Sequence, residues 1–403
     1  MKRNQSKNNK SGIYIHIPFC VKKCNYCDFL SCPSDTQTIK DYINALSKEI
    51  RIKAECFKDK EIDTIFIGGG TPSILDTSLI KQVLFALRQN YNISSDCEFT
   101  IESNPKTLDR EKLDLYLHYG INRLSIGLQS ANDEELKLLG RIHMYNDFLE
   151  SYHLARKAGI SNINVDIMSA LPKQSLESYS NTLKKVIDLK PEHISAYSLI
   201  IEENTPFYEK YSKDVKMLEN GEKPEFLPDE DTERKMYDHT LQFLESNGYH
   251  RYEISNYSKK DKECRHNLKY WSRENYLGLG LGAASLLDDI RYKNLSDLKT
   301  YIKKYSDDAI IKDVFNDESF YDELTILDEK SCMEEFMFLG FRKMKGISGL
   351  QFQEYFEKRL EDVYGKVLEE FINKGLIIYE NDYYFLSNEG INVSNYVLSK
   401  FLF

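Results

Sequence analysis

The chain of 403 residues has no long apolar run and no excess of basic side chains. A helix that crosses a membrane needs about 20 mostly apolar residues, and no stretch of this sequence approaches that length. The formal net charge of −10 is opposite in sign to that of a protein that binds nucleic acid mainly through phosphate contacts. We therefore expect neither a transmembrane segment nor a nucleic-acid partner.

The N-terminus also lacks the apolar core of a signal peptide, although its first ten residues, MKRNQSKNNK, are basic. We interpret residues 1–11 as a disordered leader and expect a cytoplasmic protein, with peripheral association with a membrane left open. Apolar residues make up 41% of the chain and charged residues 29%, which is typical of globular proteins. The length suits one large catalytic domain with a smaller appendage.

The eight cysteines are scattered along the chain, except for Cys20, Cys24 and Cys27, which lie close together in CVKKCNYC. In a reducing cytoplasm such a group favours metal or redox chemistry over disulfides. Three thiolates can hold an iron–sulfur cluster, which normally takes four, and leave one iron open; the amino and carboxylate groups of S-adenosylmethionine (SAM) can fill that position. A structural zinc site would need a second cysteine pair, which the sequence does not contain. Cys32 lies farther along and is the weaker candidate.

Short apolar, β-branched runs alternate with amphipathic stretches through the first half of the chain. Strands are expected at 12–17, 62–68, 97–103, 121–127, 163–168 and 193–199, and helices at about 36–57, 77–90, 109–119, 133–158 and 175–189. Repeated strand–helix–strand units predict a parallel sheet. Six units suit an open, partial (β/α)₆ barrel over residues 12–205.

The pattern changes after this barrel. Residues 206–305 mix helices with short β-like runs, and we interpret them as a region that caps the barrel. Residues 306–403 read as helices followed by a β-wing at 376–387 and a last helix, so we expect an α-rich, winged-helix-like domain there.

Polar and glycine-containing motifs follow these strands directly. The carboxyl ends of parallel strands meet at one edge, where active sites of α/β folds lie. Taken alone, Gly-Gly-Gly-Thr-Pro fits a tight turn, and each charged residue fits a structural salt bridge. Their common position at one rim favours a ligand site that includes Gly69, Gly70, Thr71, Glu102, Gln129, Arg141 and Asp166.

The segment His266-Asn-Leu-Lys-Tyr-Trp271 contains the only tryptophan. The imidazole of His266 can ligate heme iron, and the aromatic rings can stack on a macrocycle. On chemistry alone, a packed aromatic cluster around a hydrogen-bonded histidine is the stronger interpretation. The nearby run Gly278-Leu-Gly-Leu-Gly282 is not interpreted as a dinucleotide site, because the required βαβ context is missing.

Together these motifs resemble the radical SAM superfamily, and within it the branch of oxygen-independent coproporphyrinogen III oxidase (HemN) and the heme chaperone HemW. The resemblance runs from about residue 12 to the end, through YIHIPFCVKKCNYCDF, IFIGGGTPS, ESNP, GLQS and RHNLKYW. It implies a [4Fe–4S] cluster on Cys20, Cys24 and Cys27. It also implies SAM contacts from Tyr14, Tyr26, Gly69, Gly70, Thr71, Glu102, Gln129, Arg141, Asp166 and, more weakly, Ile200.

Two features separate the members of this branch. The oxidase has a further cysteine where this chain has Phe29, whereas His-Asn-x-x-Tyr-Trp resembles the heme-binding motif of HemW. The resemblance thus implies a heme chaperone with His266 as heme ligand, which passes heme to hemoproteins, including membrane respiratory complexes. The alternatives are coproporphyrinogen III oxidation by a 5′-deoxyadenosyl radical and another radical SAM reaction such as RNA modification. The oligomeric state stays open, a homodimer included.

Overall fold

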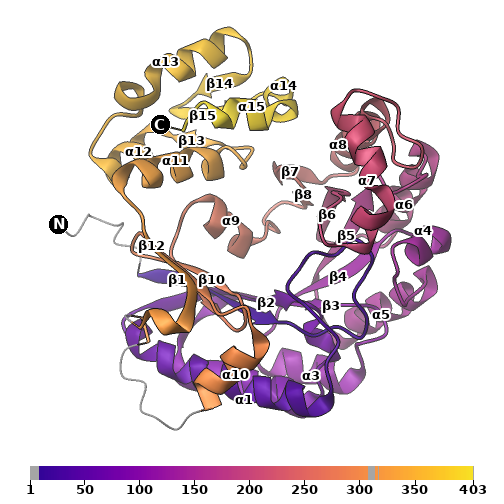
Figure 1. Cartoon of the computed structure of the whole chain (residues 1–403), viewed down its shortest axis with the longest axis vertical. Coiled ribbons are helices and arrows are strands. Elements are labelled where there is room, and N and C mark those ends of the chain that lie inside the picture. Colours follow the sequence, from indigo (N-terminus) through magenta and orange to yellow (C-terminus); the bar gives the residue numbers. More distant parts are fainter. Residues whose placement is uncertain (1–8, 307–313, 316, 403) are drawn as a thin grey trace.

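The computed structural model describes residues 9–306, 314–315 and 317–402 (Figure 1). Its largest element is a sheet of twelve strands in the order β12-β11-β10-β9-β1-β2-β3-β4-β5-β6-β8-β7. The six central strands are parallel and confirm the predicted partial barrel. They are β1 (Lys10–Ile17), β2 (Glu61–Gly69), β3 (Asn92–Ser103), β4 (Arg123–Gln129), β5 (Asn162–Ser169) and β6 (His193–Ser198).

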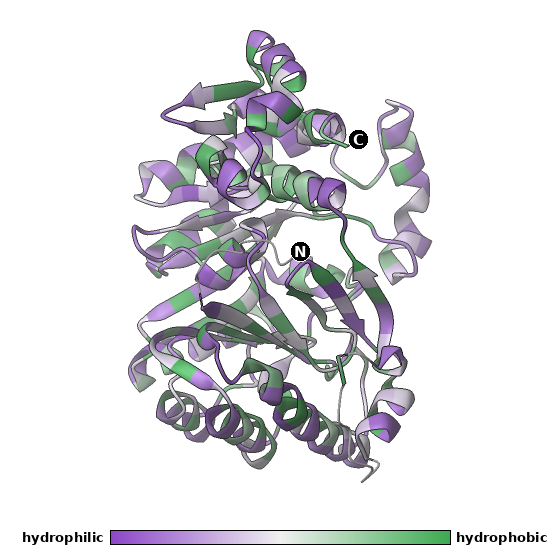
Figure 2. Cartoon of the chain, turned by 90° about the vertical axis from the view of Figure 1, so that its left-hand side faces the viewer, coloured by the Kyte–Doolittle hydropathy of each residue, from purple (hydrophilic) through white to green (hydrophobic). Residues whose placement is uncertain are grey.

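Helices follow these strands and cover the outer face of the barrel (Figure 1). They are α1 (Thr36–Ala54), α2 (Thr77–Asn90), α3 (Arg110–His118), α4 (Asp133–Leu138), α5 (Tyr145–Ala158) and α6 (Leu176–Asp188), with 3₁₀ turns at Glu55–Phe57 and Pro72–Ile74. Hydrophobic and hydrophilic residues alternate around the helices, as expected of amphipathic helices packed on a sheet (Figure 2).

Two sequence-based boundaries differ from the structure. The single helix expected over 133–158 is two helices, because Gly140 takes a left-handed φ of 76° and packs closely against the Asn25 side chain. Strand β1 begins at Lys10, inside the span expected to be a leader, because Lys10 and Ser11 pair with Glu61 and Ile62. The rest of that leader, residues 1–8, lies outside the described residues.

The region expected to cap the barrel extends its sheet at both edges, and residues 321–326, which fall in the span expected to form the C-terminal domain, also join this sheet. On one side β9 (Tyr276–Leu279) adds parallel to β1, followed by the antiparallel strands β10 (Ala284–Leu287), β11 (Ile290–Asn294) and β12 (Tyr321–Ile326). On the other side β8 (Asn256–Ser258) and β7 (His250–Glu253) add to β6. These strands pair the backbone groups that the edges of an open barrel would otherwise leave exposed.

Four helices connect these strands: α7 (Pro206–Glu219), α8 (Glu230–Ser246), α9 (Arg265–Trp271) and α10 (Leu298–Ser306). A 3₁₀ turn at Glu318–Phe320 precedes β12. Among the described residues, no helix is both long and apolar enough to cross a membrane.

The C-terminal part has its own hydrophobic core, which runs from Cys332 to Phe401. It contains α11 (Glu329–Gly340), α12 (Gly349–Phe356), α13 (Leu360–Asn373), α14 (Asn388–Asn392) and α15 (Ser394–Ser399), with a small sheet of β13 (Ile347–Ser348), β15 (Tyr383–Leu386) and β14 (Ile377–Glu380). The β14–β15 hairpin lies within the wing expected at 376–387. Arg273, in the loop after α9, joins this part to the barrel through ion pairs with Glu335 (3.0 Å) and Asp289 (2.8 Å).

Candidate cofactor site at the mouth of the barrel

The loop after β1 carries the three clustered cysteines and is closed by backbone hydrogen bonds. The Cys20 N–H donates to the Cys32 carbonyl (3.2 Å), and the Cys32 N–H donates to the Pro18 carbonyl (2.9 Å). The Cys32 Sγ lies 3.6 Å from the Ser34 hydroxyl. Cys32 therefore fastens the base of the loop through its backbone, while Cys20, Cys24 and Cys27 lie farther along it.

The thiols of Cys20, Cys24 and Cys27 line one cavity at the carboxyl ends of the strands. We call this the mouth cavity; its lining also includes Tyr26, Gly69, Gly70, Thr71, Glu102, Gln129, Arg141 and Asp166. Over the described part of the chain, no three His, Cys, Asp or Glu side chains are grouped tightly enough to hold a single metal ion. Thiols spread around a cavity suit a cluster, in which each sulfur binds a different iron, better than one zinc ion.

The loop after β2 packs tightly against the cysteine loop. The N–H groups of Gly70 and Thr71 donate to the carbonyls of Ile17 and Phe19, both at 2.8 Å, and the Gly69 N–H donates to Glu102 Oε2 at 3.0 Å. These N–H groups are therefore occupied, so a ligand contact of this loop would use its carbonyl oxygens, which suit an amino group better than a carboxylate.

Gly69 is required at its position by both conformation and space. Its φ is 110°, a left-handed value that other residues rarely adopt. A Cβ atom there would lie 2.5 Å from the His16 ring. His16 itself is fixed, because its ring contacts the Leu30 carbonyl (2.8 Å) and the Tyr14 hydroxyl (3.0 Å). The glycine thus allows β2 to end directly against the cysteine loop.

Two half-buried carboxyl groups, Glu102 on β3 and Asp166 on β5, line the mouth cavity. Asp166 accepts hydrogen bonds from Ser125 Oγ (3.1 Å) and Asn164 Nδ2 (2.7 Å). Burial, and then the charge of Asp166, raise the pKa of Glu102 from 4.5 to about 8. Burial likewise raises the pKa of Asp166. Both acids are held by neutral donors, so a cationic ligand would favour their ionised forms.

Arg141 lies between the cysteine loop and the strand ends. One guanidinium nitrogen donates to Cys24 Sγ (3.7 Å), and the other donates to Asn104 Oδ1 (2.6 Å) and to the Gly127 carbonyl (2.8 Å). Tyr26 lies beside it; burial raises the pKa of this phenol, and Arg141 opposes that rise. A fixed cation next to the Cys24 sulfur, at the cavity, is suited to bind a ligand carboxylate.

Gln129 reaches the cavity through a distorted backbone. The pairing of β4 with β5 shifts register between Gly127 and Gln129, and Gln129 has a left-handed φ of 71°. Such a conformation in a non-glycine residue marks local strain and is common at functional sites.

Two predicted SAM contacts lie elsewhere. The Tyr14 hydroxyl is bonded to His16 and is close enough to Glu102 for their charges to interact, but Tyr14 does not line the mouth cavity. Ile200 is 68% exposed and lines a different cavity. The mouth cavity also includes Asn104 and Ser125, which the sequence analysis did not single out. Asn104 belongs to the Ser-Asn-Pro motif after β3, and its position there was the available signal.

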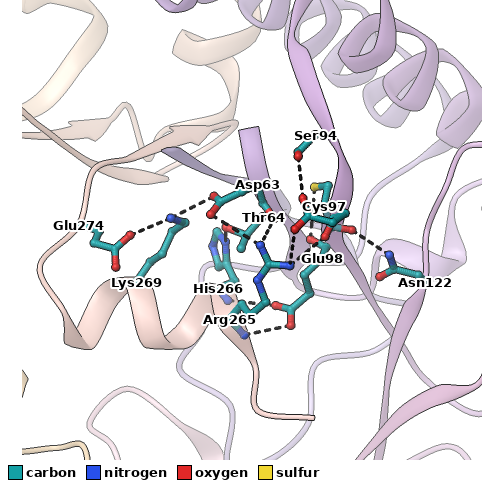
Figure 3. A network of polar contacts seen from close by, with 11 residues as sticks. Asp63, Thr64, Ser94, Cys97, Glu98, Asn122, Arg265, His266, Lys269 and Glu274 are labelled. Carbon is teal, nitrogen blue, oxygen red and sulfur yellow. Dashed lines mark hydrogen bonds and ion pairs between the residues drawn. The ribbon is translucent and has the colours of Figure 1, made fainter. Parts of the chain in front are cut away.

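His266 lies away from the mouth, in a buried network around α9 that Figure 3 shows. Its two ring nitrogens are bonded to the Thr64 hydroxyl (2.9 Å) and the Tyr270 hydroxyl (2.8 Å), and its ring stacks on Phe66. Burial lowers the pKa of His266 to about 3. In this conformation neither nitrogen can ligate heme iron, and His266 fits the other interpretation, a packed histidine with satisfied hydrogen bonds.

We call this group of side chains the α9 network; it comprises Asp63, Thr64, Glu98, Arg265, His266, Lys269, Tyr270 and Glu274. Its charged members form ion pairs and hydrogen bonds with one another and with the backbone of α9. Lys269 bridges Asp63 (3.0 Å) and Glu274 (2.8 Å). Glu98 accepts hydrogen bonds from the first N–H groups of α9, those of Arg265 and His266. A carboxylate at a helix N-terminus is favourable, so the network anchors α9 to β2 and β3.

Comparisons with known proteins show similarity along nearly the whole chain. A profile of the radical SAM superfamily matches residues 14–186, and one of the HemN C-terminal domain matches residues 327–393. The chain is 35% identical over 392 residues to the heme chaperone HemW of Lactococcus lactis, covering 97% of each chain, and 36% identical over 391 residues to that of Bacillus subtilis, covering 96% of this chain and 98% of the relative. The solved structure of coproporphyrinogen III oxidase (HemN) from Escherichia coli superposes with a TM-score of 0.80 at 24% identity, covering 97% of this chain and 89% of that one.

Proposed function

Because the chain belongs to the radical SAM superfamily, in the branch of HemN and HemW, we propose that it is a heme chaperone that binds a [4Fe–4S] cluster, SAM and heme. The observation that carries this proposal is the likeness to heme chaperones along nearly the whole chain, at 35% and 36% identity. The mouth cavity supports the cluster and SAM part, since it combines three thiols with acidic and cationic groups.

The cluster would be held by Cys20, Cys24 and Cys27. When bound, a cluster of this kind can supply an electron to the sulfonium of SAM. Arg141 places a guanidinium nitrogen 3.7 Å from Cys24 Sγ, where it donates a hydrogen bond to that sulfur. The buried carbonyl and carboxyl groups on the other wall provide acceptors for an amino group and for ribose hydroxyls.

SAM carries an ammonium, a sulfonium and one carboxylate, and the charges of the cavity suit this set. Glu102 and Asp166 would ionise beside the cationic groups or accept ribose hydroxyls, and Arg141 would pair with the carboxylate. The carbonyls of Gly69 and Gly70 would accept from the ammonium, since the N–H groups of that loop are already used.

The second candidate function is coproporphyrinogen III oxidation. Likeness to the HemN structure supports the shared fold alone. In this chain Phe29 stands where the oxidase has a further cysteine, and its side chain is 64% exposed at the mouth cavity. This substitution favours the chaperone over the oxidase. We infer that the recipients of heme are hemoproteins, including membrane respiratory complexes, and that the protein acts in the cytoplasm.

The two functions are separated by one pair of measurements on anaerobically reconstituted protein. We expect a Soret band to form with about one heme per chain when hemin is titrated in. We expect no protoporphyrinogen when the same protein receives SAM, a reductant and coproporphyrinogen III. Formation of protoporphyrinogen would overturn the chaperone proposal, as would the absence of stable heme binding.

A role of His266 as heme ligand needs its own test. Both of its hydrogen bonds must break, and α9 must move from β2, before a ring nitrogen can reach iron. If the Soret band vanishes in His266→Ala while the protein stays folded and keeps its cluster, α9 opens to bind heme. If the band persists, iron ligation by His266 is excluded and heme binds to other residues.

A further inference from the structure

A large cavity outside the mouth is built by four separate parts of the chain. Its volume is about 750 Å³, and its walls come from the β6 edge, helix α8, helix α9 and the C-terminal part. This volume is in the range of cavities that bind drug-sized ligands and cofactors. Because the barrel and the C-terminal part each have their own core, the cavity lies at a junction, where binding sites are common.

The side of α9 that faces this cavity is not the side that carries His266. Asn267 and Trp271 are four residues apart, so they share one helix face, and both line the cavity. His266 and Tyr270 share the neighbouring face and are hydrogen-bonded to each other in the α9 network. The same short motif therefore builds a buried anchor with one face and a cavity wall with the other.

Polar atoms on the cavity wall lack partners. The indole Nε1 of Trp271, the Nε of Arg342 and the Oδ1 of Asn256 are buried and have no hydrogen-bond partner within residues 9–306, 314–315 and 317–402. Buried polar groups in native proteins are nearly always satisfied, so each exception calls for a ligand, water or ion. All three atoms lie beneath the surface of residues that line this cavity.

Arg342 is placed to bind a carboxylate. Its guanidinium lies 4.4 Å from the centre of the Trp271 ring, and its contact with Glu253 is long, at 4.0 Å. Glu253 is instead held closely by the Ser255 N–H (2.9 Å) and the Asn256 side chain. Arg342 thus has hydrogen-bonding capacity to spare, and an arginine can bind a carboxylate with two parallel bonds.

The remaining walls combine aromatic rings with charges at the rim. Tyr197 is 40% exposed, and Tyr237 also lines the cavity, so flat apolar surface is available. The acidic Glu230 and Glu233 lie in the first turn of α8, where the helix dipole stabilises them. Arg234 adds a second cation next to them.

We propose that this junction cavity binds a flat, largely apolar macrocycle that carries carboxylates, with its ring against Trp271 and Tyr197 and one carboxylate on Arg342. The proposal rests on the proposed function, for which heme is the matching ligand. It assigns heme to the junction cavity and not to a His266 ligand in the α9 network. Tyr197 is near enough to Asp166 for their charges to interact, so the junction and mouth cavities are neighbours across β5 and β6.

The test is a titration cycle with two probes, hemin and its dimethyl ester, on full-length reconstituted protein. Arg342→Gln keeps polarity and approximate size but removes the charge. We expect it to weaken hemin binding at least tenfold and to leave ester binding unchanged, because the ester has no carboxylate for Arg342 to bind. The matched control is Arg359→Gln, since Arg359 lies in the C-terminal part, has a side chain 64% exposed and does not line the cavity.

The outcomes distinguish the inference from the proposed function. If wild type binds hemin and Arg342→Gln binds it equally well, the junction site is refuted while the chaperone function stands. If wild type binds no hemin, the function and the site fail together. Ser198→Trp, which fills the cavity from a half-buried position, is the second variant: it should weaken both probes, and unchanged binding of both would overturn the proposal even if Arg342→Gln misfolds.

Discussion

The mouth cavity and the α9 network both bury charged groups, but they treat them differently. In the α9 network Lys269 has two carboxylate partners, and Glu98 is bonded to the N-terminus of a helix. At the mouth, Glu102 and Asp166 are held by neutral donors; burial raises the pKa of both acids, and the charge of Asp166 raises that of Glu102 further. Arg123 is the cation near both acids.

This contrast separates structural charges from ligand-binding ones. A buried charge that is fully paired stabilises the native arrangement and resists change, whereas acids whose hydrogen bonds come from neutral donors pay a desolvation cost that a cationic ligand can lower. By the same logic, His266 in this conformation fits a structural role, and the mouth fits the proposed cofactor site.

The largest effect is expected from the cysteines of the mouth. Replacing Cys20, Cys24 or Cys27 with Ala should reduce iron and sulfide in the reconstituted protein to background, because two thiols cannot retain the cluster. Cys32→Ala should keep full iron content, because Cys32 closes the loop through its backbone. Iron and sulfide analysis checks both. Equal loss of iron in Cys32→Ala would mean that the ligand set is wrong.

A glycine at the mouth provides the next test. Gly69→Ala should destabilise the protein by about 1–3 kcal/mol, since its φ is 110° and a Cβ would meet the His16 ring. In the C-terminal part Gly365→Ala should do the opposite. Gly365 lies within α13, and a Cβ there has no contact closer than 3.9 Å, so alanine should stabilise the helix by about 0.5–1 kcal/mol. Denaturant unfolding measures the change in the free energy of unfolding for both variants. If alanine stabilised the protein at both positions, the close packing at Gly69 would be contradicted.

The sequence predicted the mouth better than the α9 network, for physical reasons. Cys20, Glu102 and Asp166 follow or end regular parallel strands, so their meeting point depends only on the repeated strand–helix pattern. His266 meets Thr64, which is 202 positions away in the chain, and nothing local to His-Asn-x-x-Tyr-Trp indicates which face of that short helix is buried.

The pairing of the added strands β7 to β12 with the barrel sheet was not predicted, for a related reason. They are short, from three to six residues, and form because the edges of the six-stranded barrel are available for pairing. A periodicity of two is weak over so few residues. The occupied N–H groups of Gly70 and Thr71 were equally hidden, since they depend on the close approach of two loops.

A pair of matched glutamates sharpens the comparison further. Glu102→Gln should weaken SAM binding about tenfold to a hundredfold, because it removes one charge-assisted hydrogen bond. It should also flatten the pH dependence of unfolding. The pKa of Glu102 is raised to about 8 in the folded state, so the wild-type protein loses stability as the pH rises from about 4.5 to 8.

Glu98→Gln is the counterpart in the α9 network. There the carboxylate is bonded to the N–H groups that begin α9, so its loss should lower the free energy of unfolding by about 1–3 kcal/mol and leave SAM affinity unchanged. Isothermal titration and denaturant melts at several pH values measure both variants. Equal losses of stability in the two variants would remove the distinction between the sites.

The prediction that isolates the α9 network is the pH response of His266. Its pKa is about 3 in the folded state, against 6.5 when unfolded, because burial disfavours the charged ring. The unfolded chain therefore binds the proton first, and the wild-type protein should lose up to about 1.4 kcal/mol per pH unit below pH 6.5, until the pH approaches 3. His266→Gln cannot take up this proton, so its stability should fall less steeply over that range, while above pH 7 the two proteins should differ by a constant amount. If the free energies of unfolding of the two proteins, plotted against pH, stayed parallel throughout, His266 would already be accessible to water in the folded state. Helix α9 would then open readily enough for the ring to reach a ligand.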